Sequence, residues 1–480
     1  MNDRKGFGSN FGFLMAAVGS AVGLGNIWGF PNKMGANGGF PFLILYLALA
    51  LCCGVIIMLG ELALGRKTGH GAVSAYQSIS KRFKWLGWLG IAAAALIFSF
   101  YSALGGYCLR YVVVNFGNLI GAEFGTNGVG GADVFQGLLS QPDVSIAFAL
   151  AFMLITMLVV MSGVGGGIER VCSVGMPALF FILIICIIRS CTLPGAADGL
   201  KYMFVPGWAV ANGIIDEAPG FWRVLTAAGG QMFFSLSLGA GVMITYGSYL
   251  DKKQDLGKSA MIIVGMDTVV ALMAGLCVIP GRFALDPNGA LGGPELLFIT
   301  MQNVFDKMGP AGPVFGILFY LLVFFAAISS SISMLEVIVA HFCDKAREKG
   351  KGDRRKLYSA IAVVICAALC ALVCADGMGS NHISPAELLG LAGAKLPGWS
   401  TSWLGLFDSV AEGLLMPLGA LLMCLMISWE LKPDTLRQEI LLNGENRPWV
   451  YDFFRLCVKY ITPLCMLMIL YGQISDFFIV

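Results

Sequence analysis

The chain alternates between long apolar segments and short polar ones over almost its whole length. About 20 mainly apolar residues cross a bilayer as a helix, and we predict eleven such spans among the 480 residues. Their centres lie near Ser20, Leu51, Phe100, Met153, Phe180, Leu236, Thr268, Ala326, Ile365, Leu418 and Cys465. The apolar runs lack the alternation of barrel strands. The pattern therefore predicts an all-α polytopic membrane protein.

Two of these spans are interrupted in the middle by glycine and small polar residues. The interruptions are AVGSAVGLGN at 17–26 and FFSLSLGAG at 233–241. A helix broken at membrane depth exposes backbone groups, which is tolerated only where they line a cavity. The alternative is that these glycines only permit close helix packing, since Gly19 and Gly23 form a GxxxG pair. Paired breaks in the two halves of a chain indicate a transporter's binding site, and Asn26 has no evident packing purpose.

Composition supports a membrane protein and points away from other classes. Hydrophobic residues make up 57% of the chain and charged residues 12%, whereas an average soluble domain is about 25% charged. The net charge of +2 gives no sign of a nucleic-acid partner. The sequence contains no Walker A, HExxH or GxSxG motif, so an enzyme is not indicated. The 14 cysteines show no metal-binding spacing and are interpreted as packing residues.

The placement of basic residues predicts the orientation. Most of the 31 Lys and Arg residues fall in segments that share a side with the N-terminus. Because basic residues favour the cytoplasmic side, we expect a cytoplasmic N-terminus and, with an odd number of spans, a C-terminus outside. Within one transporter domain over 1–480, spans one to five occupy 8–191, spans six to ten occupy 222–428, and span eleven occupies 449–476. Five is odd, so the two halves should run with opposite topology.

Polar residues inside the spans are the candidates for chemistry. Asp267 lies in the middle of the seventh span. A carboxylate at that depth is a functional hypothesis by default and needs Na⁺, a proton or a basic side chain. A structural ion pair is the alternative, but no Lys or Arg stands at matching depth. The hydroxyls of 329–331 suit an alkali cation, although membrane serines also bond back to their own helix. Tyr101 and Phe234 are either packing residues or a gate.

Together these features resemble the neurotransmitter:sodium symporter family, specifically its bacterial amino-acid transporters. The resemblance is carried by GSAVGLGNIW at 19–28, FP at 30–31, NGG at 37–39, ELALGR at 61–66 and the segment 233–249. It implies a leucine-transporter-type fold of two inverted five-helix repeats, with helices 1 and 6 broken and an eleventh helix appended. It also implies two Na⁺ ions and one substrate at the midplane, in the bacterial inner membrane.

The resemblance assigns site residues position by position. The first sodium site would use Ala21, Asn26, Ser235 and Asp267. The second sodium site would use the carbonyls of Gly19, Val22 and Ala326 and the hydroxyls of Ser329 and Ser330. The substrate pocket would be Ala21, Gly23, Leu24, Gly25, Tyr101, Phe234, Ser235, Ser237, Ala240, Ser330 and Met334. Tyr101 would hold a carboxylate, and Phe234 would close over the substrate. Arg4 and Asp344 match the family's inner gate, with Phe7 and Tyr249 nearby.

Departures from the family pattern shape the expected specificity. Gly23 stands where monoamine carriers place an Asp, which favours a substrate that brings its own carboxylate. Ala240 replaces a bulky aromatic, so we expect a large apolar or aromatic side chain. Asp267 supplies a fixed negative charge, so we expect transport without chloride. Gly29 stands where relatives commonly carry an arginine, and the tenth-span position of its acidic partner falls on Ala411. Asp408 and Glu412 flank that position. We therefore expect the outer end to close without that ion pair, through aromatic residues, a looser seal or water.

The resulting functional hypothesis is a sodium-coupled secondary transporter. It would import a neutral, large hydrophobic or aromatic amino acid by alternating access. A ligand-gated channel or a non-transporting amino-acid sensor on the same fold is the alternative. The expected partners are the amino acid, sodium and the lipid bilayer. The oligomeric state is left open.

Overall fold

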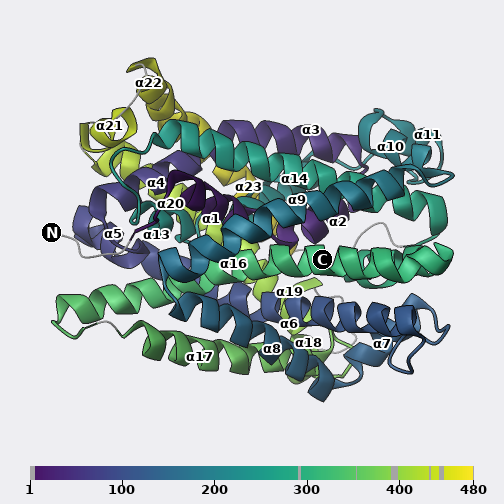
Figure 1. Ribbon diagram of the computed structural model, residues 1–480. Helices are drawn as coiled ribbons and strands as arrows, with labels where there is room; N and C mark the ends of the chain where they lie inside the picture. The colour runs from purple at the N-terminus through teal and green to yellow at the C-terminus, as the bar shows by residue number, and fades with distance from the viewer. Residues whose placement is uncertain are drawn as a thin grey trace.

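The protein is a bundle of long helices, as Figure 1 shows. The computed structural model describes residues 6–289, 293–352, 354–390, 398–431, 434–442 and 448–478. Over these residues the secondary structure consists of α-helices and short 3-10 or π-helical segments, labelled η, and no strand occurs. The all-α prediction is confirmed.

The elements up to residue 211 contain the first five predicted spans. They are α1 (Asn10–Ala21), η1 (Gly25–Gly29), α2 (Phe30–Ala36), α3 (Phe40–Leu49), η2 (Ala50–Gly54), α4 (Val55–Thr68), α5 (Ala72–Ile79), η3 (Lys81–Phe83), α6 (Leu86–Ile120), α7 (Gly131–Leu139), α8 (Pro142–Met161), η4 (Val164–Ile168), α9 (Glu169–Cys191), α10 (Ala196–Phe204) and α11 (Trp208–Ala211).

The remaining elements contain spans six to eleven. They are α12 (Phe221–Leu236), α13 (Val242–Gly247), α14 (Leu256–Leu285), η5 (Leu296–Thr300), α15 (Met301–Asp306), η6 (Gly309–Ala311), α16 (Gly312–Glu348), α17 (Arg355–Asp376), α18 (Pro385–Leu388), η7 (Gly398–Thr401), α19 (Trp403–Asp408), η8 (Ser409–Leu415), α20 (Met416–Leu425), η9 (Met426–Glu430), α21 (Asp434–Leu441), α22 (Pro448–Leu456), η10 (Cys457–Ile461) and α23 (Thr462–Phe478).

The predicted spans agree with the helices. Nine helical stretches of the described residues are long and apolar enough to cross a membrane, and α1 with η1–α2 makes a tenth as a bent pair. The remaining predicted span, the sixth, centred near Leu236, consists of the short helices α12 (Phe221–Leu236) and α13 (Val242–Gly247). The 16 residues of α12 rise about 24 Å at 1.5 Å per residue, which is too short to cross the hydrocarbon core alone.

Both predicted interruptions are real breaks in the helices. The helix α1 ends at Ala21, Val22 is extended with φ −72° and ψ 100°, and the chain bends by 44° before η1–α2. In the second break, α12 ends at Leu236 and α13 starts at Val242. Gly239 and Gly241 have φ of 80° and 74°, which glycine adopts without a Cβ penalty.

Close helix packing holds the two breaks in the centre of the bundle. The helix α1 packs against α9, α14 and α16, while α6 packs against α16 and α8. Small residues allow this, because lipid supplies little hydrophobic drive for helix association. For example, a Cβ added to Gly106 of α6 would lie 2.6 Å from the amide nitrogen of Ala149 in α8. The long helices α6 and α16 therefore form a rigid support beside the first break.

Candidate functional site

The first break frees backbone groups that side chains then take up. The amide nitrogen of Leu24 donates to the Tyr101 hydroxyl at 2.6 Å, and that of Gly23 donates to Asn26 Oδ1 at 3.0 Å. The last carbonyls of α1 also lose their helical partners, since a helix end leaves them unpaired. Ala21 is the last residue of α1, and its side chain is buried. At this break, the side chains of Tyr101 and Asn26 therefore replace the helical partners of two backbone amides.

Asp267 is the centre of a fully buried polar cluster beside this break. Asn26 Nδ2 donates to Asp267 Oδ1 at 2.8 Å, and the Ser235 hydroxyl lies 2.9 Å from Oδ2. The Tyr46 hydroxyl donates to Oδ2 at 3.2 Å. All four side chains are 0% exposed. The structure thus brings together three of the four predicted residues of the first sodium site, and the side chains that hydrogen-bond to the carboxylate carry no charge.

A second group of oxygen atoms meets on the other side of α1. The Ser329 hydroxyl lies 3.4 Å from the carbonyl oxygen of Val22 and 3.0 Å from that of Ala326. The Ser330 hydroxyl lies 3.4 Å from the carbonyl oxygen of Gly19. These are the five residues predicted for the second sodium site. Hard, uncharged oxygen donors of this kind suit an alkali cation.

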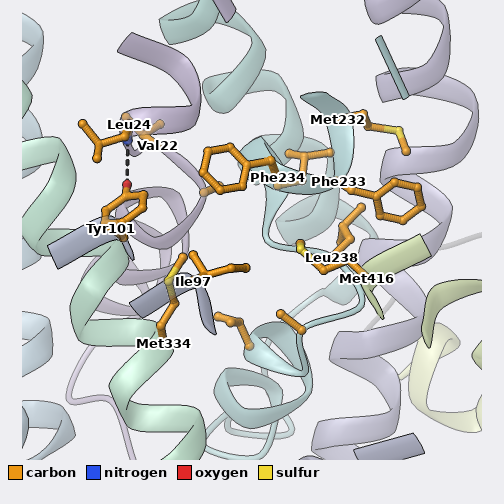
Figure 2. Close-up of a cluster of buried hydrophobic side chains, with 14 of the residues drawn as sticks. Val22, Leu24, Ile97, Tyr101, Met232, Phe233, Phe234, Leu238, Met334 and Met416 are labelled. Atoms are coloured by element: carbon orange, nitrogen blue, oxygen red, sulfur yellow. Dashed lines mark hydrogen bonds between the residues drawn. The ribbon is translucent and has the colours of Figure 1, made fainter. Parts of the chain in front are cut away.

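Aromatic and apolar side chains pack together between the two breaks. The rings of Tyr101 and Phe234 lie 6.3 Å apart, and Figure 2 shows Ile97 and Met334 on the Tyr101 side, facing Phe234. Tyr101, Ile97 and Met334 are each at most 3% exposed and Phe234 is 7% exposed. Ile97, one helical turn before Tyr101, was not predicted as a site residue. The predicted pocket residues therefore lie together and are shielded from solvent.

The neighbouring side chains of Tyr101 and Ser330 leave room only for a glycine at position 23. A Cβ there would collide with the Ser330 hydroxyl and the Tyr101 hydroxyl, and a Cβ on Gly25 would lie 3.0 Å from the Phe234 ring. Any side chain at position 23 would displace groups on both α6 and α16.

Hydrogen bonds connect the second break to the first break and to the neighbouring helix α4. The Ser237 hydroxyl donates to the Ser20 carbonyl at 3.1 Å. Glu61 of α4 accepts a hydrogen bond from the Gly239 amide at 2.7 Å. Ala240 is 1% exposed, and its carbonyl faces Gly90 of α6. The predicted residues Ser237 and Ala240 thus lie within the left-handed turn, in which Ser237 itself has a φ of 52°.

Three polar residues of the site were not predicted from the sequence. They are Tyr46 on Asp267, Glu61 on Gly239, and Gln231, whose amide donates to the Gly25 carbonyl at 2.6 Å. Glu61 and Gln231 are buried inside predicted spans, so their polarity at membrane depth was the same signal that Asp267 gave. Tyr46 carried no such signal, because its ring is apolar and only the hydroxyl is polar.

Aromatic and charged residues gather at the end of the bundle near the N-terminus. The ring of Phe7 lies 5.7 Å from Tyr246 and 6.2 Å from Tyr249. Asp344 accepts a hydrogen bond from the Gly71 amide at 3.0 Å. Its predicted gate partner, Arg4, lies outside the described residues.

A further ion pair at this end was not predicted. Arg355 of α17 donates to Glu336 of α16 through both Nη atoms, at 2.5 and 3.0 Å. The Tyr249 hydroxyl, after α13, donates to the same carboxylate at 2.6 Å. Since the Glu336 side chain is 0% exposed, this carboxylate links three elements from inside the protein.

At the opposite end, the structure contains an ion pair close to the two positions where the family's own pair is missing. Lys33 of α2 forms an ion pair with Glu412 of η8. The family pattern points to Gly29 and Ala411, with Asp408 and Glu412 as flanking residues. Lys33 lies one helical turn after Gly29, and Glu412 follows Ala411 directly, so the charges are displaced along both helices.

Comparisons with known proteins agree with this arrangement. The family model described as the sodium:neurotransmitter symporter family matches residues 4–127 and 132–478. The sodium-dependent transporter YhdH of Bacillus subtilis is 36% identical over 477 residues, which are 97% of each chain. The sodium-dependent transporter MJ1319 of Methanocaldococcus jannaschii is 30% identical over 459 residues, covering 91% of this chain and 84% of that protein.

The solved structures include a close match in fold. The crystal structure of MhsT in complex with L-phenylalanine superposes with a TM-score of 0.83 at 33% sequence identity. The match covers 98% of this chain and 100% of the other.

Proposed function

Because this chain belongs to the sodium:neurotransmitter symporter family and is a sodium-dependent membrane transporter rather than an enzyme, we propose that it imports a neutral amino acid with a large apolar or aromatic side chain. Two Na⁺ ions would drive each import event. The family assignment does not favour the channel or the sensor considered from the sequence.

The observation that carries this proposal is the set of side chains that hydrogen-bond to Asp267. A buried charge is costly unless it is paired, yet Asn26, Ser235 and Tyr46 are all neutral. A cation bound here would compensate the carboxylate. Oxygen atoms from Asn26, Ser235 and the Ala21 carbonyl are the ligand type that Na⁺ prefers, and the end of α1 adds its partial negative charge. We therefore assign the first sodium ion to this cluster.

The second sodium ion belongs at the meeting point of α1 and α16. The carbonyls of Gly19, Val22 and Ala326 and the hydroxyls of Ser329 and Ser330 supply only neutral oxygens. An ion there bridges α1 to α16. Its binding would favour one arrangement of these two helices over the other, which is the role that alternating access needs.

The backbone at the first break suits a substrate carboxylate. The Leu24 amide and the Tyr101 hydroxyl lie 2.6 Å apart. Both are hydrogen-bond donors that could bind an anionic group. The bound carboxylate would then complete the coordination of the first sodium ion. Each ligand raises the affinity of the other, because binding linkage is reciprocal, and this couples the two transport events.

The side-chain end of the substrate would face Ile97, Met334, Phe234 and Ala240. The small Ala240 leaves room at the wall of the pocket for a large side chain. The L-phenylalanine complex of the related protein MhsT supports this size class. Since Asp267 already provides a negative charge near the first sodium site, we also propose that chloride is not required.

Transport would proceed by alternating access between two gates. The Lys33–Glu412 pair lies at the predicted outer end, and the Phe7 cluster with Asp344 lies at the predicted cytoplasmic end. We propose that the repeats over 8–191 and 222–428 move relative to each other in inverted orientation. The N-terminus would be cytoplasmic and the C-terminus outside.

Competition binding on the purified protein tests the proposed function. Radiolabelled L-phenylalanine is bound with and without Na⁺ and displaced by each of the twenty amino acids. We expect sodium-dependent binding that is displaced by Trp, Tyr, Phe, Leu and Met, with the same values in chloride and gluconate. Preference for glycine or alanine, or binding that ignores sodium, would contradict the proposal. Accumulation against a gradient in proteoliposomes then separates a transporter from a sensor or channel.

A further inference from the structure

An apolar groove opens on the membrane-facing surface between α8 and α9. Both helices pack against α16, and Figure 1 shows α16 between them. The groove has a volume of about 420 Å³. Its lining includes Ile155, Arg170, Gly175, Met176, Phe324 and Ser329. The three helices are all long and apolar enough to span a membrane, so lipid faces this groove.

One end of the groove carries a positive charge. Arg170 is exposed and stands in the first turn of α9. The carboxylate of its neighbour Glu169 is directed toward the N-terminal segment, where it accepts hydrogen bonds from the Gly8 amide at 2.7 Å and the Ser9 hydroxyl at 2.8 Å. Successive helical residues point about 100° apart, so Glu169 faces α1 while Arg170 lines the groove.

We propose that this groove binds one anionic phospholipid, with an acyl chain between α8 and α9 and the phosphate on Arg170. The charge complements a phosphate group, for which the guanidinium is the preferred side chain. Basic residues beside clefts between membrane helices recognise anionic head groups in this way. The remainder of the lining is almost entirely apolar and suits a hydrocarbon chain.

The floor of the groove adjoins the oxygen cluster assigned to the second sodium ion. Ser329 belongs to both, and a Cβ added to Gly19 would lie 3.0 Å from Met176 Sδ and 3.2 Å from Ser329 Cβ. An acyl chain in the groove therefore packs against the side chains that support this cluster. We infer that the lipid raises the apparent affinity for Na⁺, an inference that rests on the proposed function.

Photo-crosslinking tests the lipid site directly. The purified full-length protein is labelled with phosphatidylglycerol that carries a diazirine in its acyl chain, and the labelled peptides are mapped by mass spectrometry. We expect label on residues 155–178 and 324–329, displaced by excess phosphatidylglycerol but not by phosphatidylcholine. Label elsewhere on the surface, or equal displacement by the two lipids, would overturn the site.

Matched variants separate the groove from general effects on folding. Gly175→Leu fills the groove, since a Cβ at position 175 meets nothing within 4 Å. Gly265→Leu on α14 is the control, because its Cβ also meets nothing within 4 Å. Arg170→Gln is compared with Arg189→Gln near the other end of α9. We expect Gly175→Leu and Arg170→Gln to lower labelling at least about fivefold and the two controls to leave it unchanged. Equal labelling of all four proteins would overturn the proposal.

A separate measurement tests the link to sodium. Sodium-dependent phenylalanine binding is titrated in nanodiscs of phosphatidylglycerol and of phosphatidylcholine. We expect an apparent affinity for Na⁺ about threefold higher in phosphatidylglycerol, with the difference absent in Gly175→Leu. Equal affinities alongside positive crosslinking would overturn the coupling and leave the lipid site. Absence of sodium-dependent binding in both lipids would instead count against the proposed function.

Discussion

Lys33 of α2 and Glu412 of η8 form an ion pair at the end of the bundle opposite the N-terminus. The side chains are 24% and 8% exposed, respectively, so the pair is largely withdrawn from water. Asp408, one turn before Glu412, places a second carboxylate near this pair. Removing one partner of a largely buried ion pair destabilises the protein strongly, because the other charge is left unpaired. The pair is therefore suited to hold α2 and η8 together as a reversible closure.

Breaking this pair should open the outer end. In Lys33→Met or Glu412→Gln we expect bound phenylalanine to dissociate about tenfold faster, which corresponds to ~1.4 kcal/mol. The double variant should behave like either single variant, because each one removes the same interaction. Dissociation of radiolabelled substrate from purified protein measures the effect.

The pair between Lys307 and Asp286 provides a control. Its lysine is 51% exposed, and surface ion pairs contribute little, so Lys307→Met should leave the dissociation rate unchanged. Additive effects of Lys33→Met and Glu412→Gln would show that the two residues do not act as a pair.

Replacing the Asp267 carboxylate should alter how substrate binding depends on sodium and on chloride. In Asp267→Asn the first sodium site loses its fixed negative charge, so we expect an apparent Na⁺ affinity at least about tenfold weaker. Chloride should now stimulate binding, since an added anion can take the place of the lost charge. Sodium titrations in chloride and in gluconate measure both effects.

Ser235→Ala distinguishes charge from ligand loss at the same site. It removes the hydroxyl that lies 2.9 Å from Asp267 Oδ2 but keeps the carboxylate. Sodium affinity should fall while chloride remains without effect. If Asp267→Asn retains the wild-type sodium dependence, the assignment of the first sodium ion to this cluster is wrong.

The glycine at position 23 should tolerate no side chain. Gly23→Ala would push a methyl group into Ser330 and Tyr101, so we expect phenylalanine binding to be lost. Gly265→Ala on the membrane-facing side of α14 has no contact within 4 Å of its new methyl group and should bind normally. Normal binding by Gly23→Ala would mean that the substrate does not occupy this space.

Enlarging Ala240 should shift the preference toward smaller substrates. A phenyl ring in Ala240→Phe would fill the wall of the proposed pocket. We expect phenylalanine and tryptophan to lose affinity by about a hundredfold, or ~2.7 kcal/mol, while alanine and leucine gain relative to them. Competition binding across amino-acid sizes checks this, and an unchanged order of preference would place the side chain elsewhere.

The breaks and the buried aspartate were predictable because each violates a rule of the membrane interior. Glycine and polar residues in the middle of a span conflict with a continuous helix, and the structure breaks the helices after Ala21 and Leu236. A single carboxylate without a basic partner conflicts with the cost of burying charge. Such conflicts are visible in the sequence without knowledge of the neighbours.

Residues whose role depends on a partner from a distant segment were not predictable in the same way. Lys33 and Glu412 are separated by 379 positions, and nothing local indicates that they meet. Tyr46 likewise acquires its role only when α3 packs against α12 and brings its hydroxyl to Asp267. The relation of the groove to Ser329 also depends on the packing of three helices.

The carboxylate of Glu336 should keep the end near the N-terminus closed. It binds Arg355 and the Tyr249 hydroxyl at once, so it joins α16 and α17 to the segment after α13. In Glu336→Gln the charge that compensates the largely buried Arg355 is lost, which costs about 3 kcal/mol or more. We expect faster hydrogen exchange in residues 242–249 and weaker binding of phenylalanine, because the closed arrangement is less populated.

The exposed Arg347 is the matched control for this prediction. It lies 3.9 Å from Asp344 and is 52% exposed, so Arg347→Gln removes a charge from the same end with little effect on packing. Tyr249→Phe isolates the link to α13, since it keeps the Glu336–Arg355 pair and removes only the hydroxyl. If Tyr249→Phe reproduces the faster exchange in 242–249, the hydroxyl is the connection that closes this end. Unchanged exchange in both Glu336→Gln and Tyr249→Phe would show that the buried carboxylate only stabilises α16 and α17.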